Sequence, residues 1–178
     1  GVRAVVSADR DRIGYGAEDV SAHESGAEAG GVSASFLAAL DCRYVLVGHS
    51  ERRTLHAEDD DVVAAKTRAA VGAGIVPISC VGETEADLEQ HGPSAVPVAQ
   101  LRAALDGVPK GAEIVVAYEP VWAIGSGQAA TPEQAQQVAA ALRAELVNLL
   151  GEEAASATRV LYGGSVKSGN AAEILARE

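Results

Sequence analysis

The stretch that decides the fold begins with Ile114-Val-Val-Ala-Tyr118 and continues with Glu119-Pro-Val-Trp-Ala-Ile-Gly125-Ser-Gly127. An apolar, β-branched run without alternation is typical of a strand that is covered on both faces. A carboxylate and a loop of small residues follow this strand at once. We expect such a strand in a parallel α/β sheet, where ligands bind beyond the carboxyl ends of the strands.

Similar runs lie on both sides of this strand. The clearest are Tyr44-Val-Leu-Val-Gly48, Ile75-Val-Pro-Ile-Ser-Cys-Val81 and Arg159-Val-Leu-Tyr162, and a weaker candidate covers residues 13–17. Helical patterns lie between the runs, so strands and helices alternate. This alternation indicates βα units around a parallel sheet. No low-complexity linker divides the chain, and we expect residues 1–178 to form one domain.

Four helices have ends that can be read from the sequence. Ser33 is expected to cap a helix that places Phe36, Leu37 and Leu40 on one face. The acidic run 59–61 favours a helix start, and the glycines at 72 and 74 favour its end. The remaining signals are Val98, Leu101 and Leu105 after the Gly92-Pro93 break, and the capping box Thr131-Pro132-Glu133-Gln134 before Val138, Leu142, Leu146 and Leu149, with an end at Gly151.

Composition excludes several classes of partner. The chain has 178 residues, 48% of them hydrophobic, and a formal net charge of -11, so it lacks the basic face that nucleic acids and anionic membranes require. No apolar run has the length of a membrane span. Cys42 and Cys80 are too few for a disulfide scaffold and indicate a reducing compartment.

Polar residues that follow the strands are the candidates for chemistry. His49 precedes a plausible helix start at Ser50, where a positive imidazolium is disfavoured, so we expect a neutral ring that can donate a hydrogen bond. Glu119 leaves a buried strand and is a natural general base. The Gly163-Gly-Ser165 turn offers backbone N–H groups to an anion, and Gly125 and Gly127 flank a loop that we expect to close. Together these groups suit proton abstraction next to a carbonyl in a small phosphate ester.

Each of these residues also has a purely structural interpretation. His49 can be a hydrogen-bonded structural histidine, and Glu119 can simply cap the turn at Pro120. We interpret Cys80 as a small buried residue near the site, not as a nucleophile. The histidines have no ligand spacing, so we expect no metal site; they are His23, His56 and His91.

Three motifs resemble those of the triosephosphate isomerase family, in its bacterial form. They are Val47-Gly-His-Ser-Glu-Arg-Arg53, Ala117-Tyr-Glu-Pro-Val-Trp-Ala-Ile-Gly125 and Tyr162-Gly-Gly-Ser-Val166, in the order in which the family has them. Residues 13–33 resemble its third strand and dimer loop. The similarity covers essentially the whole chain. It implies a (β/α)8 TIM barrel of which this chain holds about five of the eight units, strands three to seven.

The resemblance also implies roles for individual residues. Glu119 would move the proton between two carbons of a phosphorylated triose, neutral His49 would polarise the carbonyl, and Glu51 would be a supporting carboxylate; the pairing of base and neutral imidazole is the established one for this family. Gly125 and Ser165 would bind the phosphate. The closing lid would comprise Pro120, Val121, Trp122, Ala123, Ile124, Gly125, Ser126 and Gly127. The family needs no cofactor or metal, works in the cytoplasm in glycolysis and gluconeogenesis, and forms a homodimer, here through residues 19–33.

The chain departs from the family pattern at several positions. No strand before Ile13 carries the substrate-binding asparagine and lysine of the family, and no eighth strand follows before Glu178. Ala29 stands where the dimer loop often has a threonine, and Gln128 where the lid often has a basic residue. We therefore expect the chain to be part of a longer enzyme and to be inactive alone, because a lost cation in a dry site weakens transition-state stabilisation.

Two other functions stay open on the sequence. One is a different phosphate-binding barrel isomerase or epimerase, against which Tyr118-Glu-Pro-Val-Trp122 argues. The other is a barrel fragment without catalytic activity that serves interaction or assembly through residues 19–33.

Overall fold

A computed structural model describes residues 13–124, 126 and 128–176, and in it a single parallel sheet organises the chain. The strands are β1 (Gly16–Ala17), β2 (Tyr44–Val47), β3 (Val76–Val81), β4 (Val115–Tyr118) and β5 (Arg159–Tyr162), which lie in chain order across the sheet. All four pairings are parallel, with Val45 beside Pro77 and Val81 beside Tyr118. The predicted α/β fold with βα units is confirmed.

Helices connect the strands. They are α2 (Ala34–Ala39), α3 (Ser50–His56), α4 (Asp60–Gly72), α5 (Glu85–His91), α6 (Ala95–Ala104), α7 (Pro132–Leu150), α8 (Glu152–Ala157) and α9 (Ala171–Leu175), with a 3₁₀ turn η1 at Val121–Ala123. The predicted caps are present: Ser33, Asp59 and Thr131 each accept a hydrogen bond from a backbone N–H of the first turn. The Thr131–Gln134 capping box is complete.

Two parts of the helix prediction need correction. Leu37 is buried, but Phe36 is 57% exposed, because the two neighbours point about 100° apart on a helix and the buried face runs through Ala34 instead. The short helices α5, α8 and α9 were not identified from their sequences, and α5 and α9 bury no residue among those described. An apolar stripe is the signal that identifies a helix in a sequence, and helices that bury few or no residues do not need one.

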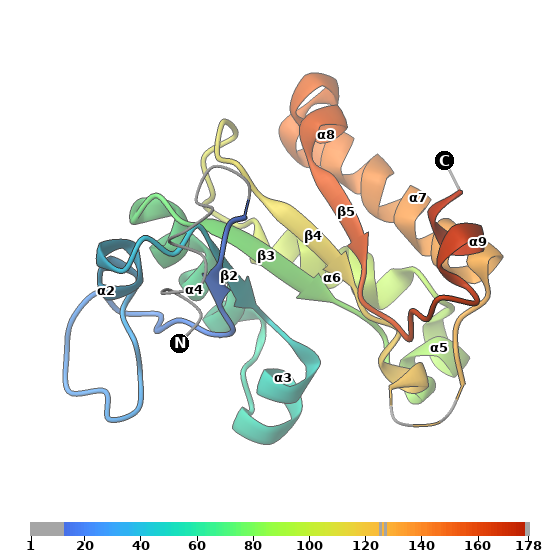
Figure 1. The fold of residues 1–178 in the computed structure, drawn as a ribbon, viewed down its shortest axis with the longest axis horizontal. Coiled ribbons are helices and arrows are strands. Elements are labelled where there is room, and N and C mark those ends of the chain that lie inside the picture. The colour runs from blue at the N-terminus through green and yellow to red at the C-terminus, as the bar shows by residue number, and fades with distance from the viewer. Residues whose placement is uncertain (1–12, 125, 127, 177–178) are drawn as a thin grey trace.

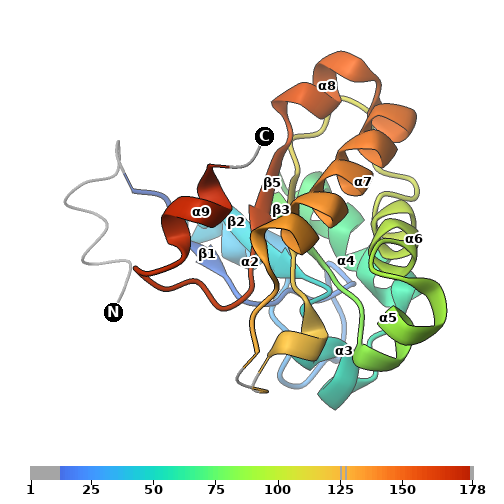
Figure 2. The same cartoon turned by 90° about the vertical axis from the view of Figure 1, so that its right-hand side faces the viewer.

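Helices α4, α6 and α7 lie in a row along one side of the sheet (Figures 1 and 2). The larger core lies between α6, α7, β3 and β4 and includes Leu101, Val116, Leu142 and Leu146. A second core lies between α2, α4 and β2. The packing therefore leaves the carboxyl ends of the strands to the loops, and α3 and η1 both lie at that lower edge in Figure 1.

The described sheet is open, with β1 and β5 at its edges. The expectation that strands are covered on both faces is correct for β4, whose residues are all buried, and wrong for β5, whose burial alternates. Leu161 in β5 is 43% exposed because an edge strand has a neighbour on one side. The five described strands thus form part of a barrel wall and not a closed barrel.

A buried ion-pair network joins the segment before α2 to α3 and α4. The Lys66 ammonium lies 2.6 Å from carboxylate oxygens of both Asp19 and Glu58. Arg52 lies 2.5 Å from Glu58 and 3.2 Å from Asp19. Burial raises the pKa of Glu58, but the hydrogen bonds from Lys66 and Arg52 outweigh it, and the pKa is lowered overall. The network fixes the start of α3, directly after His49.

Candidate active site

Two polar side chains from different strands meet at the carboxyl edge of the sheet. His49 follows β2, Glu119 follows β4, and His49 Nε2 lies 3.1 Å from Glu119 Oε1. The carboxylate is largely enclosed, since Glu119 is 8% exposed. The two side chains predicted to act as electrophile and base therefore lie close together, and their catalytic roles stay predictions.

The surroundings of His49 fix which ring nitrogen carries the proton. His49 is the N-cap residue of α3, and its Nδ1 accepts the backbone N–H of Glu51 at 3.2 Å. A nitrogen that accepts a hydrogen bond carries no proton, so the neutral ring is protonated on Nε2. The N–H of that nitrogen points to Glu119 Oε1.

Backbone contacts hold Glu119 on two sides. Its N–H donates to Val81 O at 2.8 Å, and Gly163 N–H donates to Tyr118 O at 2.7 Å. The ends of β3 and β4 approach so closely that a Cβ on Gly82 would lie 1.8 Å from Glu119 O. These contacts leave the backbone of Glu119 little freedom to shift.

A second carboxylate lies behind the base. Glu83 is fully buried, and its Oε1 accepts hydrogen bonds from Tyr118 Oη at 2.9 Å and from Trp122 Nε1 at 2.7 Å. Burial raises the pKa of Glu83, and the bonds from Trp122 and Tyr118 offset this only in part. The carboxyl joins the strand that carries the base to the turn that follows it.

A model of one protein family, described as triosephosphate isomerase, matches residues 2–178. The chain belongs to the triosephosphate isomerase family. It is 68% identical over 171 residues to the triosephosphate isomerase of Leifsonia xyli, which covers 96% of the chain and 66% of that relative. The enzymes so named in Rhodococcus jostii and Streptomyces avermitilis are 51% and 49% identical and cover 98% and 99% of the chain. The chain spans about two thirds of the length of these curated relatives.

Most residues of the lid motif of the family are described. Val121–Ala123 form the turn η1, Pro120 O accepts the N–H of Ala123, and Ser126 Oγ donates to Ala123 O at 3.2 Å. Ile124 is 49% exposed. Gly125, predicted to bind phosphate, and Gly127 lie outside the described residues.

The remaining predicted residues of the family site lie on exposed segments. Glu51 is exposed on the first turn of α3, and its contact with His49 comes from its backbone N–H. Ser165 is exposed after β5, and its carbonyl oxygen accepts a hydrogen bond from the Asn170 side chain at 2.9 Å. The roles of Glu51 and Ser165 stay predictions.

Cys80 is buried as predicted. Its burial, and after it the charge of Glu119, raise the pKa of the thiol to about 12. The thiol is therefore protonated and unreactive at neutral pH. Among the residues described, no group of three or more His, Cys, Asp or Glu side chains is placed to hold a metal ion. Within the same ranges, no helix is long and apolar enough to span a bilayer.

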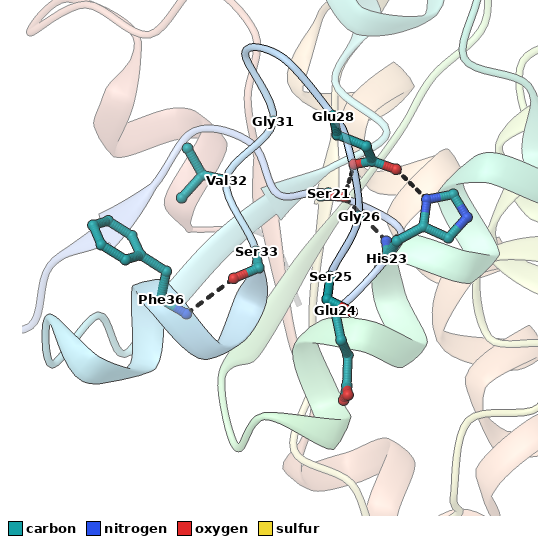
Figure 3. A pocket seen from close by; sticks show the side chains of 10 residues that line it. All are labelled: Ser21, His23, Glu24, Ser25, Gly26, Glu28, Gly31, Val32, Ser33 and Phe36. Carbon is teal, nitrogen blue, oxygen red and sulfur yellow. Dashed lines mark hydrogen bonds and ion pairs between the residues drawn. The ribbon is translucent and has the colours of Figure 1, made fainter.

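A separate pocket of about 370 Å³ is lined by residues between Ser21 and Phe36, away from His49 and Glu119. Glu28 reaches both Ser21 and His23 across this loop, and Val32 and Phe36 lie on the opposite side (Figure 3). Serine and histidine both contact the carboxylate, so the histidine does not activate the serine as a nucleophile. The cluster holds the loop together instead.

Sequence reasoning missed Glu83 and Gly82 as parts of the site. The only local signal was a glycine and a carboxylate directly after a buried strand. The hydrogen-bond partners of Glu83, Tyr118 and Trp122, are 35 and 39 residues away in the chain, so these contacts depend on the order of the strands in the sheet.

The raised pKa of Glu83 predicts a pH effect on stability. The folded chain binds the Glu83 proton more tightly than the unfolded chain, so this group lowers the free energy of unfolding as pH rises from the ordinary glutamate pKa through the raised folded value. In Glu83→Gln, which keeps an oxygen acceptor and has no charge, we expect a shallower fall in stability as pH rises above the ordinary glutamate pKa. Urea melts at several pH values measure this, and parallel curves for the two proteins would contradict it.

Proposed function

We propose that these residues form the proton-transfer part of a triosephosphate isomerase site, which interconverts dihydroxyacetone phosphate and glyceraldehyde 3-phosphate. The observation that carries the proposal is the 3.1 Å contact of His49 Nε2 with Glu119 Oε1, together with the Nδ1 atom occupied by the Glu51 N–H. A base and a neutral hydrogen-bond donor meet at one point, as proton abstraction next to a carbonyl requires.

In the proposed reaction Glu119 removes a proton from C1 of dihydroxyacetone phosphate. The electron pair moves into the C1–C2 bond, and charge develops on the carbonyl oxygen at C2, where His49 Nε2–H donates a hydrogen bond. The proton of the C1 hydroxyl then passes to the oxygen on C2, Glu119 returns its proton to C2, and the electron pair left on the C1 oxygen forms the aldehyde carbonyl. No oxidant or cofactor is needed, since the substrate and the product are isomers.

We propose that the lid from Pro120 to Gly127 closes over this intermediate, and that Gly125 and Ser165 bind the phosphate. Two observations support a closing movement. Glu83 accepts a hydrogen bond from Trp122 and so anchors one end of the lid, and Ile124, further along the lid, is exposed and therefore not packed in place. Closure would exclude water and slow the loss of phosphate from the enediolate.

A chimaeric protein tests the proposed activity. The matched segment of the Leifsonia xyli enzyme is replaced by the corresponding residues of this chain, at 68% identity. We expect turnover of glyceraldehyde 3-phosphate within about tenfold of the unmodified relative, because the catalytic pair is intact. We expect the 178-residue chain alone to be inactive for two reasons. Its described sheet is open, and the family's substrate-binding lysine has no counterpart in Lys66, whose ammonium is held by Asp19 and Glu58. A folded but inactive chimaera would contradict the proposed function, and rapid turnover by the chain alone would contradict the second expectation.

We also propose that residues 19–33 mediate homodimerisation of the protein in the cytoplasm. The loop projects from the sheet (Figure 1), Val32 on it is 39% exposed, and Phe36 on the following helix α2 is 57% exposed. The neighbouring helix α3 buries none of its residues, and Leu55 on it is 73% exposed. Exposed apolar groups on adjacent elements suit a protein interface. In the chimaera we expect Phe36→Asp to convert dimers to monomers in light scattering, whereas Val147→Asp on the distant α7 should not; unchanged dimers in Phe36→Asp would contradict this interface.

A further inference from the structure

Gln100 on α6 makes a contact at the centre of the site that the catalytic roles do not explain. Its Oε1 accepts the backbone N–H of Gly82 at 2.8 Å. Gly82 lies just beyond β3, where its N–H has no strand partner among the pairings of β3 with its neighbours. A side chain from a helix on the outer layer thus satisfies a backbone donor at the carboxyl edge of the sheet.

The Val81–Gly82 peptide, which Gln100 holds, lies between Glu119 and the residues that contact Trp122. On one side, Gly82 approaches Glu119 O so closely that a Cβ would lie 1.8 Å from it. On the other side, Glu83 binds Trp122 Nε1 at 2.7 Å and Tyr118 Oη at 2.9 Å. A rotation of this peptide would therefore shift the base and the hinge together.

We propose that Gln100 is a positioning residue: its side-chain oxygen fixes the Val81–Gly82 peptide, whose carbonyl oxygen accepts the Glu119 N–H at 2.8 Å, and thereby places both Glu119 and, through Glu83, Trp122. The inference rests on the proposed function, because it assigns Gln100 to the same reaction. The amide oxygen is suited to this role, since it accepts a hydrogen bond without adding a charge next to the catalytic carboxylate.

Two substitutions separate the hydrogen bond from the packing. Gln100→Leu keeps much of the volume and removes the acceptor, whereas Gln100→Glu keeps an oxygen that can accept the Gly82 N–H. Gln90→Leu, the same change at an exposed position at the end of α5, serves as the matched control. Trp122 is the one tryptophan of the chain, so the indole signal reports the hinge directly.

The test follows three readouts. In the 178-residue chain carrying Gln100→Leu we expect hydrogen exchange at Gly82 to become about tenfold faster, the effect of one lost hydrogen bond, and the Trp122 emission to shift to the red. In the chimaera we expect kcat to fall about tenfold with KM nearly unchanged, because the base and not the phosphate site is displaced. Gln100→Glu should restore the Gly82 exchange rate and the Trp122 emission, because it keeps the acceptor, and Gln90→Leu should leave all three values unchanged.

A folded Gln100→Leu chain with unchanged Trp122 emission and Gly82 exchange overturns the proposal, as does Gln100→Glu behaving like Gln100→Leu. If Gln100→Leu does not fold, Gln100→Asn, which is one methylene too short for the contact, replaces it. Loss of folding in both assigns Gln100 to stability alone and also overturns the proposal. The emission and exchange measurements need no catalysis. A chimaera that is inactive with every variant therefore refutes the proposed function, and the positioning role of Gln100 is then decided by emission and exchange alone.

Discussion

In the chimaera, Glu119→Gln is expected to lower kcat by a factor on the order of 10²–10⁴, the contribution of a well-placed general base. The amide has nearly the same shape as the carboxylate and can still accept the hydrogen bond from His49 Nε2. It cannot take a proton from carbon at neutral pH. We therefore expect KM to change little, because the groups proposed to bind phosphate lie on other segments. Steady-state kinetics with glyceraldehyde 3-phosphate give both constants.

Glu89→Gln is the matched control for this substitution, because Glu89 is an exposed carboxylate on α5. Its kcat should equal that of the parent chimaera. A Glu119→Gln protein that keeps more than about one tenth of the parent kcat would remove Glu119 from the role of base.

Gly82→Ala is expected to cost about 3 kcal/mol of folding free energy or more, at the upper end for overpacked sites. The added Cβ would lie 1.8 Å from Glu119 O and 2.8 Å from its carbonyl carbon, and both are backbone atoms that no rotamer change can move away. In a protein of this size such a loss lowers Tm by roughly 6–12 °C. Calorimetry or urea unfolding of the purified protein measures it, and we expect the Trp122 emission to change as well, since Glu83 is the next residue.

Gly72→Ala provides the comparison. Gly72 ends α4, and a Cβ there would meet no atom within 4 Å among the described residues. Because alanine favours the helix over glycine, we expect a gain of up to about 1 kcal/mol. Equal effects of the two substitutions would mean that the close approach at Gly82 does not constrain the fold.

The sequence predicted those parts of the molecule that depend on local chemistry. The capping box at Thr131 and the buried stripe of α7 are set by neighbouring residues, and both are present. The pairing of His49 with Glu119 was also predictable, since parallel strands bring their carboxyl ends to one edge.

Features that depend on tertiary contacts were missed. Glu83, Tyr118 and Trp122 come together through the pairing of β3 with β4, and nothing in their local sequence announces the hydrogen bonds. Phe36 was placed on the wrong face, because a six-residue helix gives too short a stripe to separate adjacent apolar positions. The exposure of β5 could not be predicted from its composition, since a strand of the same apolar character is buried at the centre of a sheet and half exposed at its edge.

The order of the strands has a consequence for how the proposed enzyme can vary. His49, Glu83 and Glu119 follow β2, β3 and β4, which are adjacent in the middle of the described sheet, whereas Ser165 follows β5 at its edge. In the proposed site, proton transfer is assigned to the three central strands, whereas phosphate binding is shared between the loop after β4 and the turn after the edge strand β5. If the proposed function holds, substitutions in the turn after β5 will change mainly the affinity for substrate, whereas substitutions after β2, β3 and β4 will change kcat.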